Sequence, residues 1–259
     1  MQSRIGFALL ISLLAGLATI IGGLAGLVTS EPSPRFLSAA LGFSAGAMLF
    51  VSFVELLQRG IGSLGSNMTY ISFFIGVLLM FLVDIFIPGA YNGWSYGTHN
   101  NFIKRKSRDK AHLTQAGILL AVGIALHNFP EGIASFAGTV QDRRLGIAIA
   151  SAIALHNIPE GLAVSALIYS ATGSRRSALF WTFLAGIAEP LGAALAALAI
   201  VPGLNERLIN IMLSVVAGIM VFISLNELIP ISYSFGKDRL SITGIILGMA
   251  AMAVSILLL

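Results

Sequence analysis

The chain contains no cysteine, and only 10% of its 259 residues are charged. The absence of thiols excludes disulfide bonds, iron–sulfur clusters and cysteine-based zinc sites. A metal ion bound here must therefore use imidazole, carboxylate, amide or backbone oxygen ligands. The shortage of charge, together with 57% hydrophobic residues, places the composition far outside the range of soluble domains. We expect an integral membrane protein embedded in a lipid bilayer.

Long apolar segments account for most of the chain. A helix needs about 20 apolar residues to cross the hydrocarbon of a bilayer, and eight segments of this kind are present. Their approximate bounds are 5–28, 36–57, 68–87, 113–139, 145–170, 177–201, 208–234 and 240–259. We predict a single all-α transmembrane domain over residues 1–259, with a long cytoplasmic loop at 88–112. The first segment lacks a cleavage site, so we interpret it as a retained helix and not a signal peptide.

Lysine and arginine lie in loops or at helix ends, and their distribution predicts the orientation. With the N-terminus outside, ten basic residues fall on the cytoplasmic side and five on the outer side, in agreement with the positive-inside rule. We therefore place both termini outside a prokaryotic inner membrane, and we expect no nucleic-acid partner. His99 and His112 of the long loop either sample metal ions or are ordinary residues of a solvated basic loop.

One short sequence occurs twice in the middle of the chain. Ile124-Ala-Leu-His-Asn-Phe-Pro-Glu-Gly132 is followed by Ile153-Ala-Leu-His-Asn-Ile-Pro-Glu-Gly161. Because helical residues four positions apart share a face, the histidine and glutamate of each copy can lie side by side. The short link between the two segments predicts antiparallel helices, with both histidines near the bilayer midplane. We expect the four side chains to surround a common centre.

Four glutamates lie well inside the predicted spans, away from the span ends, and no lysine or arginine lies in the spans to neutralise them. They are Glu131, Glu160, Glu189 and Glu227. A charged carboxylate at the bilayer centre costs about 3 kcal/mol, so four cost on the order of 10 kcal/mol, which is comparable with the stability of a whole domain. Bound cations, protons or water must stabilise them. Imidazole combined with carboxylate suits zinc and other first-row divalent ions.

The polar residues of the spans predict two adjoining metal sites. The first comprises His127, Glu131, His156 and Glu160, and the second comprises Asn128, Asn157 and Glu189. The alternatives are a buried hydrogen-bond network for the first group and helix–helix hydrogen bonds for the asparagines. Glu55 and Glu227 are candidate pathway ligands or proton carriers, unless they snorkel at helix ends. Asp84, Ser52 and Ser224 are further candidates, and membrane serines often bond their own helix.

A less obvious repeat relates the two ends of the chain. The segment from Ala45 to Leu57 aligns without gaps with the segment from Ala217 to Ile229, including a serine and a glutamate. A shorter match sets Leu17-Ala-Thr-Ile20 against Leu184-Ala-Gly-Ile187. The paired spans cross the membrane in opposite directions, as in the inverted repeats of secondary transporters. We predict eight helices in a 3+2+3 inverted-repeat arrangement, with the two motif helices between related flanks.

These features resemble the ZIP (Zrt-, Irt-like protein) family of metal transporters, and most of all its bacterial ZupT group. The resemblance covers the whole chain and rests on the doubled His-Asn-x-Pro-Glu-Gly motif, Ala188-Glu189 and Asn226-Glu227-Leu-Ile-Pro230. It implies a binuclear metal centre between spans four and five, with the motif glutamates bridging, and import of divalent metal into the cytoplasm. Asn157 and Asn226 are uncharged where some members carry aspartate.

The combined features predict a carrier that works by alternating access. Its transported substrate is Zn²⁺, with Fe²⁺, Mn²⁺, Co²⁺ or Cd²⁺ as competitors, and no catalytic cofactor is expected. One alternative is an intramembrane zinc-dependent hydrolase, but the H-E-x-x-H pattern is absent, and we do not expect an enzyme. Another alternative is a metal-gated channel or a metal sensor. The spacing from Gly22 to Gly26 permits close helix pairing and hence a homodimer.

Overall fold

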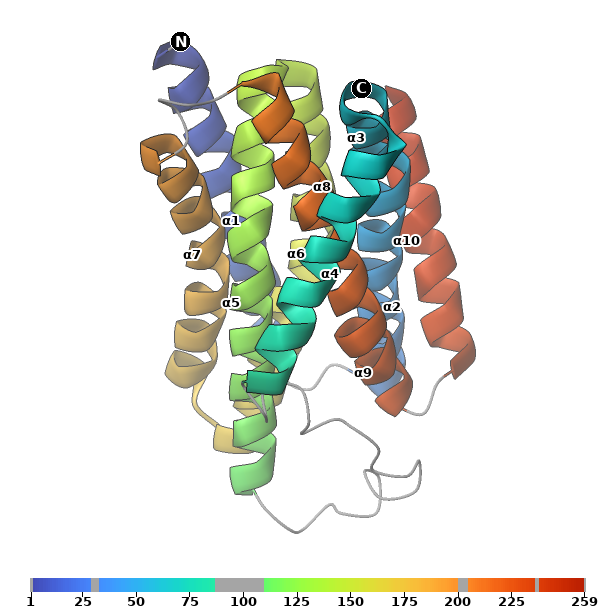
Figure 1. The fold of residues 1–259 in the computed structure, drawn as a ribbon. Coiled ribbons are helices and arrows are strands. Elements are labelled where there is room, and N and C mark those ends of the chain that lie inside the picture. The colour runs from blue at the N-terminus through green and yellow to red at the C-terminus, as the bar shows by residue number, and fades with distance from the viewer. Residues whose placement is uncertain (1, 29–32, 87–109, 200–204, 236–237, 259) are drawn as a thin grey trace.

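Helices form all the regular structure in the described part of the chain. The computed structural model describes residues 2–28, 33–86, 110–199, 205–235 and 238–258, and Figure 1 shows its arrangement. The helices are α1 (Gln2–Val28), α2 (Pro34–Phe50), η1 (Val51–Leu56), α3 (Leu57–Leu64), α4 (Ser66–Phe86), α5 (Lys110–Gln141), α6 (Arg143–Thr172), α7 (Arg175–Ala199), α8 (Glu206–Ile223), η3 (Ser224–Leu228), α9 (Ile229–Ser234) and α10 (Asp238–Leu258). No strand occurs within these ranges, which confirms the predicted all-α class.

Eight helical rods make up the described fold, because α2, η1 and α3 form one continuous rod and α8, η3 and α9 form another. Seven of the rods, over the residues that are described, have the length and apolar composition needed to cross a membrane. The eighth rod, α5, contains 32 residues, which is about 48 Å of helix. The start of α1 and the end of α10 lie at the same end of the molecule in Figure 1. The protein is a multi-pass membrane protein.

The first residues of α5 belong to the segment that was predicted to be a loop. α5 begins at Lys110, so residues 110–112 of the predicted loop are helical, because no glycine or proline separates them from the apolar segment that follows. His99 lies outside the described residues, and the side chain of His112 is likewise not described. The metal-sampling role of these two histidines stays a prediction.

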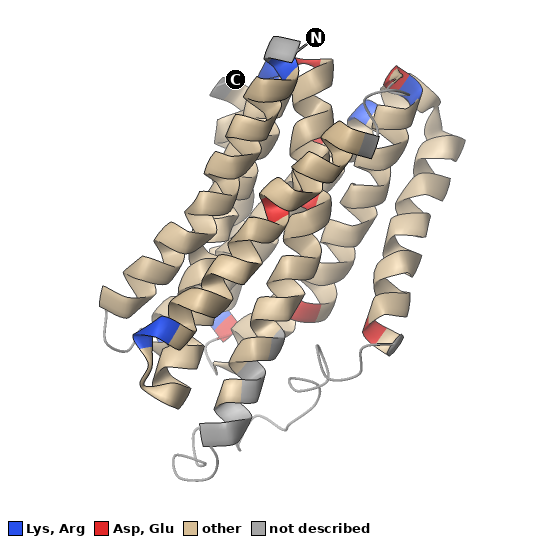
Figure 2. Ribbon diagram, turned by 90° about the vertical axis from the view of Figure 1, so that its left-hand side faces the viewer, with Lys and Arg blue, Asp and Glu red and all other residues tan. Residues whose placement is uncertain are grey.

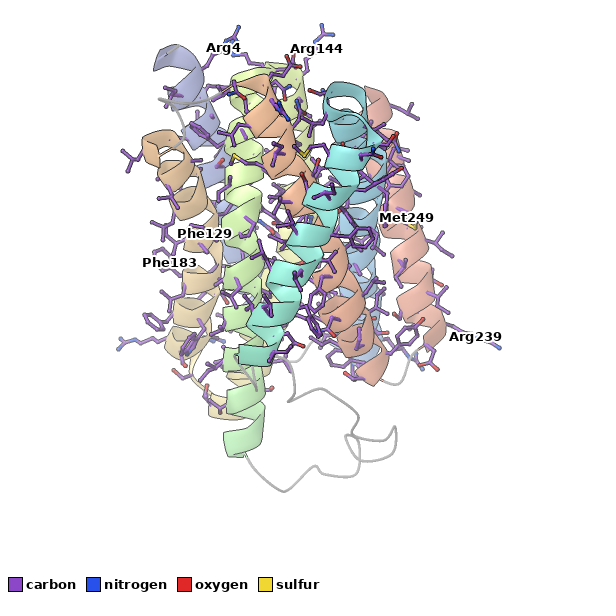
Figure 3. All side chains as sticks on the ribbon, in the orientation of Figure 1. Arg4, Phe129, Arg144, Phe183, Arg239 and Met249 are labelled. Carbon is purple, nitrogen blue, oxygen red and sulfur yellow. The ribbon has the colours of Figure 1, made fainter. Side chains whose placement is uncertain are left out.

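Many large apolar side chains lie exposed on the outside of the helices, whereas the His and most Ser and Thr side chains that are described lie buried inside. Phe183 of α7 and Met249 of α10 are 46% and 39% exposed and point away from the molecule in Figure 3. In Figure 2 the arginines lie at the ends of the helices, and acidic residues also lie between the ends. A bilayer explains this distribution, because lipid solvates apolar side chains and leaves polar groups to be satisfied within the protein.

The helices pack in two groups that meet at the motif helices. α1, α5, α6 and α7 contact one another, whereas α2 packs on α10 and α4 packs on α8. Most contacts between the groups join α2 to α6 and α5 to α8. The first group, α1, α5, α6 and α7, is called here the motif bundle, and α2, α4, α8 and α10 are called the flanking bundle. A side chain on α5 or α6 can therefore lie at the boundary between two bundles.

The packing repeats itself in inverted form. α1 packs on α6 as α7 packs on α5, and α2 packs on α10 as α8 packs on α4. The closest approaches follow the same pattern, since a Cβ on Gly46 would meet the carbonyl of Ile245, and a Cβ on Gly218 would meet the carbonyl of Phe73. Gly218 follows Gly46 in the chain by the same interval as Ile245 follows Phe73. The 3+2+3 inverted repeat is thus present in the helix contacts.

The register of α1 against α7 differs from the predicted one. Asn157 donates a hydrogen bond to the carbonyl of Ala15, and Asn128 donates the corresponding bond to the carbonyl of Ala185. These contacts align Leu14-Ala-Gly-Leu-Ala-Thr19 with Leu184-Ala-Gly-Ile-Ala-Glu189. The predicted match of Leu17–Ile20 with Leu184–Ile187 was therefore wrong. Short runs of Leu, Ala, Ile and Gly fit several registers, and only the contacts distinguish them.

Two π-helical segments occupy equivalent positions in the flanks. η1 includes Ser52 and η3 begins at Ser224, which are the serines of the repeat between α2 and α8. A π-helical segment inserts one residue into a turn, and such segments are frequent at functional sites. No feature of the sequence had predicted these two π-helical segments.

The link between α5 and α6 consists of Asp142, which caps α6. Its carboxylate accepts hydrogen bonds from the backbone N–H groups of Arg144 (2.7 Å) and Leu145 (3.0 Å). The hydrogen bond from Leu145, followed by that from Arg144, lowers the pKa of Asp142 below its usual 3.8. Because the folded pKa is the lower one, this stabilisation is complete above pH 3.8 and is lost as the pH falls through the folded pKa.

Replacing Asp142 with alanine is expected to lower the melting temperature by a few degrees at pH 7. The difference from the wild type should shrink in acid, where the carboxyl is protonated in both states. Asn205 is the matched control, since its side chain caps α8 through Leu208 N at 2.8 Å but does not titrate. Thermal unfolding of Asn205→Ala should show a deficit that is the same at both pH values. An Asp142→Ala deficit that persists undiminished in acid would contradict the assignment.

Candidate metal site

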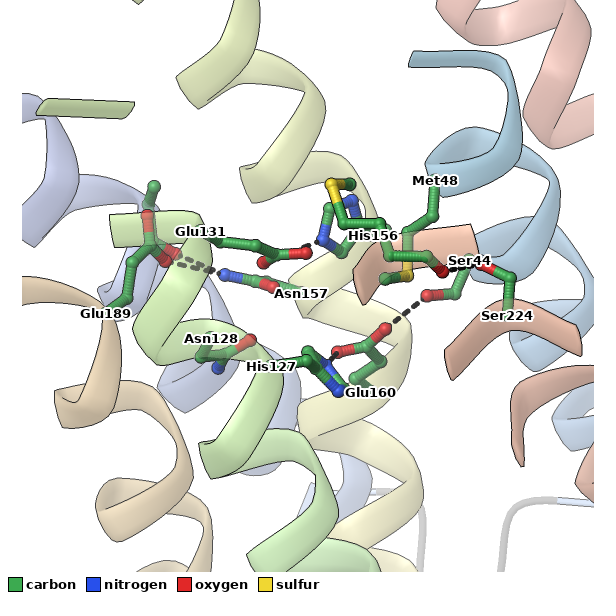
Figure 4. Close-up of polar contacts among 12 residues, drawn as sticks. Ser44, Met48, His127, Asn128, Glu131, His156, Asn157, Glu160, Glu189 and Ser224 are labelled. Carbon is green, nitrogen blue, oxygen red and sulfur yellow. Dashed lines mark hydrogen bonds and ion pairs between the residues drawn. The ribbon is translucent and has the colours of Figure 1, made fainter. Parts of the chain in front are cut away.

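The two copies of the motif face each other on neighbouring antiparallel helices. α5 carries His127, Asn128 and Glu131, and α6 carries His156, Asn157 and Glu160. Both helices continue through the motif prolines. All six side chains, and Glu189 of α7, are buried. Figure 4 shows them converging from α5, α6 and α7, so the structure brings together every residue of the two predicted metal sites.

Two glycines bring neighbouring helices close to the motifs. A Cβ on Gly132 would clash with the backbone carbonyl of Glu189, and a Cβ on Gly161 would clash with the carbonyl of Thr19. Each glycine directly follows a motif glutamate. The close approach of α7 to Gly132 explains why Glu189 lies near Glu131.

Each histidine bonds the glutamate of the opposite helix and not the glutamate of its own helix. His127 Nε2 lies 2.9 Å from Glu160 Oε2, and His156 Nε2 lies 3.2 Å from Glu131 Oε2. The spacing of the motif had predicted that the histidine and glutamate of one helix lie side by side. The antiparallel crossing places the histidine of one helix level with the glutamate of the other, so the pairs form across the interface between α5 and α6.

The asparagines tie the motif helices to their outer neighbours. Asn128 Nδ2 donates to the carbonyl of Ala185 at 3.0 Å, whereas Asn157 Nδ2 donates to the carbonyl of Ala15 at 3.1 Å and to Glu189 Oε2 at 2.9 Å. The helix–helix hydrogen bonds expected as the alternative role are thus present. They use only the amide nitrogens, so both carbonyl oxygens stay available for another partner.

The cluster contains several buried polar atoms that have no hydrogen-bond partner. These atoms are Nδ1 of His127 and His156, Oδ1 of Asn128 and Asn157, and Oε1 of Glu131 and Glu189. Leaving a buried polar group unpaired costs about 1–3 kcal/mol. Nitrogen and oxygen lone pairs gathered in this way are the usual ligands of zinc and related divalent ions. The donor set therefore fits a dication as the missing partner.

The cluster is arranged as pairs and not as a completed metal cage. Within the described ranges, no three His, Asp or Glu side chains are placed so that they could hold one ion together. Each imidazole instead bonds one carboxylate directly. Zinc bonds of about 2.0–2.2 Å at the tetrahedral angle would hold a nitrogen and an oxygen about 3.3 Å apart. The observed separations of 2.9 and 3.2 Å are close to that value. An ion could replace either direct contact with a small movement of the side chains.

Ser44 of α2 is a site residue that was not predicted from the sequence. Its hydroxyl donates to Glu160 Oε1 at 2.5 Å, so this carboxylate contacts both His127 and the flanking bundle (Figure 4). The residue at the equivalent position of α8 is Val216, which cannot form such a bond. Ser44 precedes the repeated segment by one residue and lies far from the motifs in sequence, so no pattern identified it.

Glu227 and Glu55 are equivalent in the repeat but differ in their surroundings. Glu227 of η3 is buried, and its Oε1 has no partner. A Cβ on Gly123 of α5 would lie 3.2 Å from Glu227 Oε2, so this carboxylate faces the motif bundle. The side chain of Glu55 is 14% exposed and pairs with Arg59 at 2.5 Å. The structure therefore directs Glu227, and not Glu55, toward the helices that carry the site.

The remaining polar candidates lie outside the cluster of histidines and glutamates. Ser52 Oγ donates to the carbonyl of Met48 at 2.7 Å, and Ser224 Oγ donates to the carbonyl of Met220 at 2.8 Å. Both serines thus bond their own helix, as the alternative interpretation expected. Asp84 lies near the end of α4, and its Oδ1 has no partner.

Comparisons with a family model and with individual proteins identify the same family. The family model described as ZIP Zinc transporter matches residues 98–256. A protein named zinc transporter ZupT from Corynebacterium efficiens is 44% identical over 264 residues, covering 99% of this chain and 98% of the relative. A protein of the same name from Oceanobacillus iheyensis is 46% identical and covers 97% of this chain and 97% of the relative. Another from Streptococcus mutans is 43% identical and covers 100% of this chain and 99% of the relative.

Proposed function

The chain belongs to the ZIP family of zinc transporters, and on that premise we propose that it carries Zn²⁺ into the cytoplasm through the site between α5 and α6. The protein is a metal transporter and not an enzyme. The observation that supports the proposed route is the group of buried His, Asn and Glu atoms without hydrogen-bond partners. The transported ion would supply the partner that these atoms lack.

We propose two adjoining positions for the ion. His127, Glu131, His156 and Glu160 form the first, and Asn128, Asn157 and Glu189 form the second. The hydrogen bond from Asn157 to Glu189 supports this grouping, as does Figure 4, in which Glu131 and Glu189 lie on either side of the Asn157 amide. Glu131, bonded to His156 and bordering Asn157, would bridge the two positions.

Alternating access would arise from movement between the two bundles. An inverted repeat can open toward either side of the membrane by exchanging the conformations of its related halves. The motif bundle holds all of the proposed ligands. The Ser44–Glu160 hydrogen bond crosses to the flanking bundle, so it would break or re-form during each transport cycle. Glu227, facing α5 across the same boundary, would line one of the two routes.

Zinc uptake by purified protein in liposomes tests this function. Saturable flux that depends on the protein is expected for a carrier, and flux that rises linearly with external zinc would indicate a channel. No protein-dependent flux would contradict transport itself. Competition by Fe²⁺, Mn²⁺, Co²⁺ and Cd²⁺ in the same assay measures the metal preference.

The proposed orientation places both termini on the outer side of the inner membrane. Because the chain has no cysteine, single cysteines introduced near each end can be labelled without background. A membrane-impermeant maleimide applied to intact cells should modify both positions. If the two cysteines were labelled in permeabilised cells but not in intact cells, the termini would lie in the cytoplasm and the proposed orientation would be wrong. Cross-linking through the same cysteines would test the homodimer.

Replacing Ser44 with alanine is expected to raise the half-saturating zinc concentration about tenfold, because residues that orient metal ligands typically contribute this much. Ser44 Oγ holds Glu160 Oε1 in place. Ser224→Ala is the matched control, since Ser224 is also buried but bonds only its own helix. The uptake assay should show little change for the control. Equal effects of the two variants would contradict a special role for Ser44.

A further inference from the structure

Thr19 of α1 carries a buried hydroxyl that has no hydrogen-bond partner. It is the only such Ser or Thr hydroxyl among the residues that the structure describes. A buried threonine in a helix normally donates to the carbonyl four residues earlier, as Thr139 and Thr182 do at 2.6 and 2.9 Å. For Thr19 that carbonyl belongs to Ala15, which instead accepts the amide of Asn157 at 3.1 Å. The Thr19 hydroxyl is thus left without the partner that its own helix usually supplies.

Two independent sets of contacts make Thr19 the inverted counterpart of Glu189. The asparagine hydrogen bonds relate Ala15 to Ala185. The close approaches relate the carbonyl of Thr19, against Gly161, to the carbonyl of Glu189, against Gly132. In both relations the residue of α7 follows its counterpart in α1 by the same number of positions in the sequence. Thr19 therefore occupies the position on one side of the motif helices that Glu189 occupies on the other.

The inverted repeat also indicates which side chain corresponds to the partner of Glu189 on the Thr19 side. Glu189 Oε2 accepts a hydrogen bond from Asn157, and the equivalent of Asn157 in the other motif is Asn128. The Asn128 carbonyl oxygen is buried and has no partner, like the Thr19 hydroxyl. The Cβ of Thr19 would lie 3.2 Å from a Cβ placed on Gly186 of α7, so the side chain points into the motif bundle between α1 and α7.

We propose that the Thr19 hydroxyl is a neutral oxygen ligand of the transported dication, on the Asn128 side of the site. This inference rests on the proposed function. A hydroxyl has a lone pair to offer the ion but adds no negative charge to a site that already holds Glu131, Glu160 and Glu189. Glu189 and Thr19 would thus give the site one charged side and one neutral side, and the ion would leave the neutral side more easily.

Thr19→Val tests the proposal, because valine keeps the shape of threonine and removes only the oxygen. Zinc uptake in liposomes should show a half-saturating concentration about tenfold higher than that of the wild type. Thr19→Ser, which restores the hydroxyl, should return it to within twofold. Thr182→Val is the matched control, since Thr182 is equally buried but bonds the carbonyl of Ala178. It should behave as the wild type.

Thr19→Glu gives a readout that a purely structural role would not produce. An added carboxylate should lower the half-saturating zinc concentration and also lower the maximal rate, because the ion is released more slowly. If Thr19→Val does not fold, Thr19→Ala compared with Thr19→Ser replaces it. Normal zinc uptake by Thr19→Val or Thr19→Ala would overturn this proposal while leaving the transport function intact. Absence of uptake by the wild type would instead overturn the function.

Discussion

Replacing His127 with alanine is expected to reduce zinc uptake about 100-fold or more, at the upper end of the losses seen for groups around a metal. Two effects combine in this variant. The imidazole is removed as a ligand, and the Glu160 carboxylate loses its partner at 2.9 Å while it stays buried. Uptake of radioactive zinc into liposomes, at matched amounts of protein, measures the loss. His156→Ala, the inverted counterpart, should show a loss of similar size.

A double variant separates a ligand from a structural partner. If His127 served only to neutralise Glu160, then His127→Ala combined with Glu160→Gln would remove both charges and restore much of the stability and uptake. If both residues bind the ion, the double variant should regain stability but not uptake. Recovery of uptake in the double variant would contradict the proposed first metal position. Glu206→Gln, at the exposed start of α8, controls for the loss of a carboxylate elsewhere.

Replacing Gly132 with alanine is expected to lower the melting temperature by roughly 5 °C or more and to impair uptake. The added Cβ would clash with the backbone carbonyl of Glu189, and a helix backbone cannot move aside as a flexible side chain can. Overpacking of this kind typically costs about 1–3 kcal/mol of folding stability. The melting temperature of a protein of this size falls by about 2–4 °C for each kcal/mol lost. Separating α5 from α7 would also withdraw Glu189 from the cluster. Thermal unfolding followed by the fluorescence of the two tryptophans measures the change.

Two exposed glycines serve as controls for the substitution itself. A Cβ on Gly6 of α1 or on Gly62 of α3 would have no atom within 4 Å. Alanine there should leave the melting temperature unchanged or raise it slightly, because alanine favours the helix. Gly161→Ala, against the carbonyl of Thr19, should match Gly132→Ala. A melting temperature of Gly132→Ala equal to that of Gly6→Ala would contradict the close packing of α5 on α7.

The elements that could be predicted are those in which lipid and helical periodicity act locally. An apolar segment of about 20 residues spans a bilayer whatever its neighbours are. For this reason the eight helical rods can be predicted from the apolar composition of each segment alone. The doubled motif likewise needs no partner to be recognised, because one buried histidine and one glutamate per helix are unusual in a membrane segment. The family resemblance rested on the same residues, and the comparisons confirmed it.

The elements that could not be predicted depend on which helices touch. His127 and His156 each pair with the glutamate of the opposite helix because α5 and α6 cross antiparallel. The spacing of residues within one helix cannot reveal such a pairing. Ser44 joins the site only because α2 packs on α6. The register of α1 on α7 was wrong because short apolar matches are ambiguous, whereas the hydrogen bonds from Asn128 and Asn157 leave a single choice.

From hydropathy and charge alone, this protein is predicted to cross a membrane as helices and to hold ionisable groups in its interior with no lysine or arginine in the same spans. Hydropathy and charge are properties of each segment, so they can be evaluated without knowledge of the fold. How these groups meet depends on the folded structure. Each histidine pairs with a glutamate across two antiparallel helices, and Thr19 occupies the position on one side that Glu189 occupies on the other. Such contacts join residues distant in the chain, and the packing of one helix backbone on another selects them.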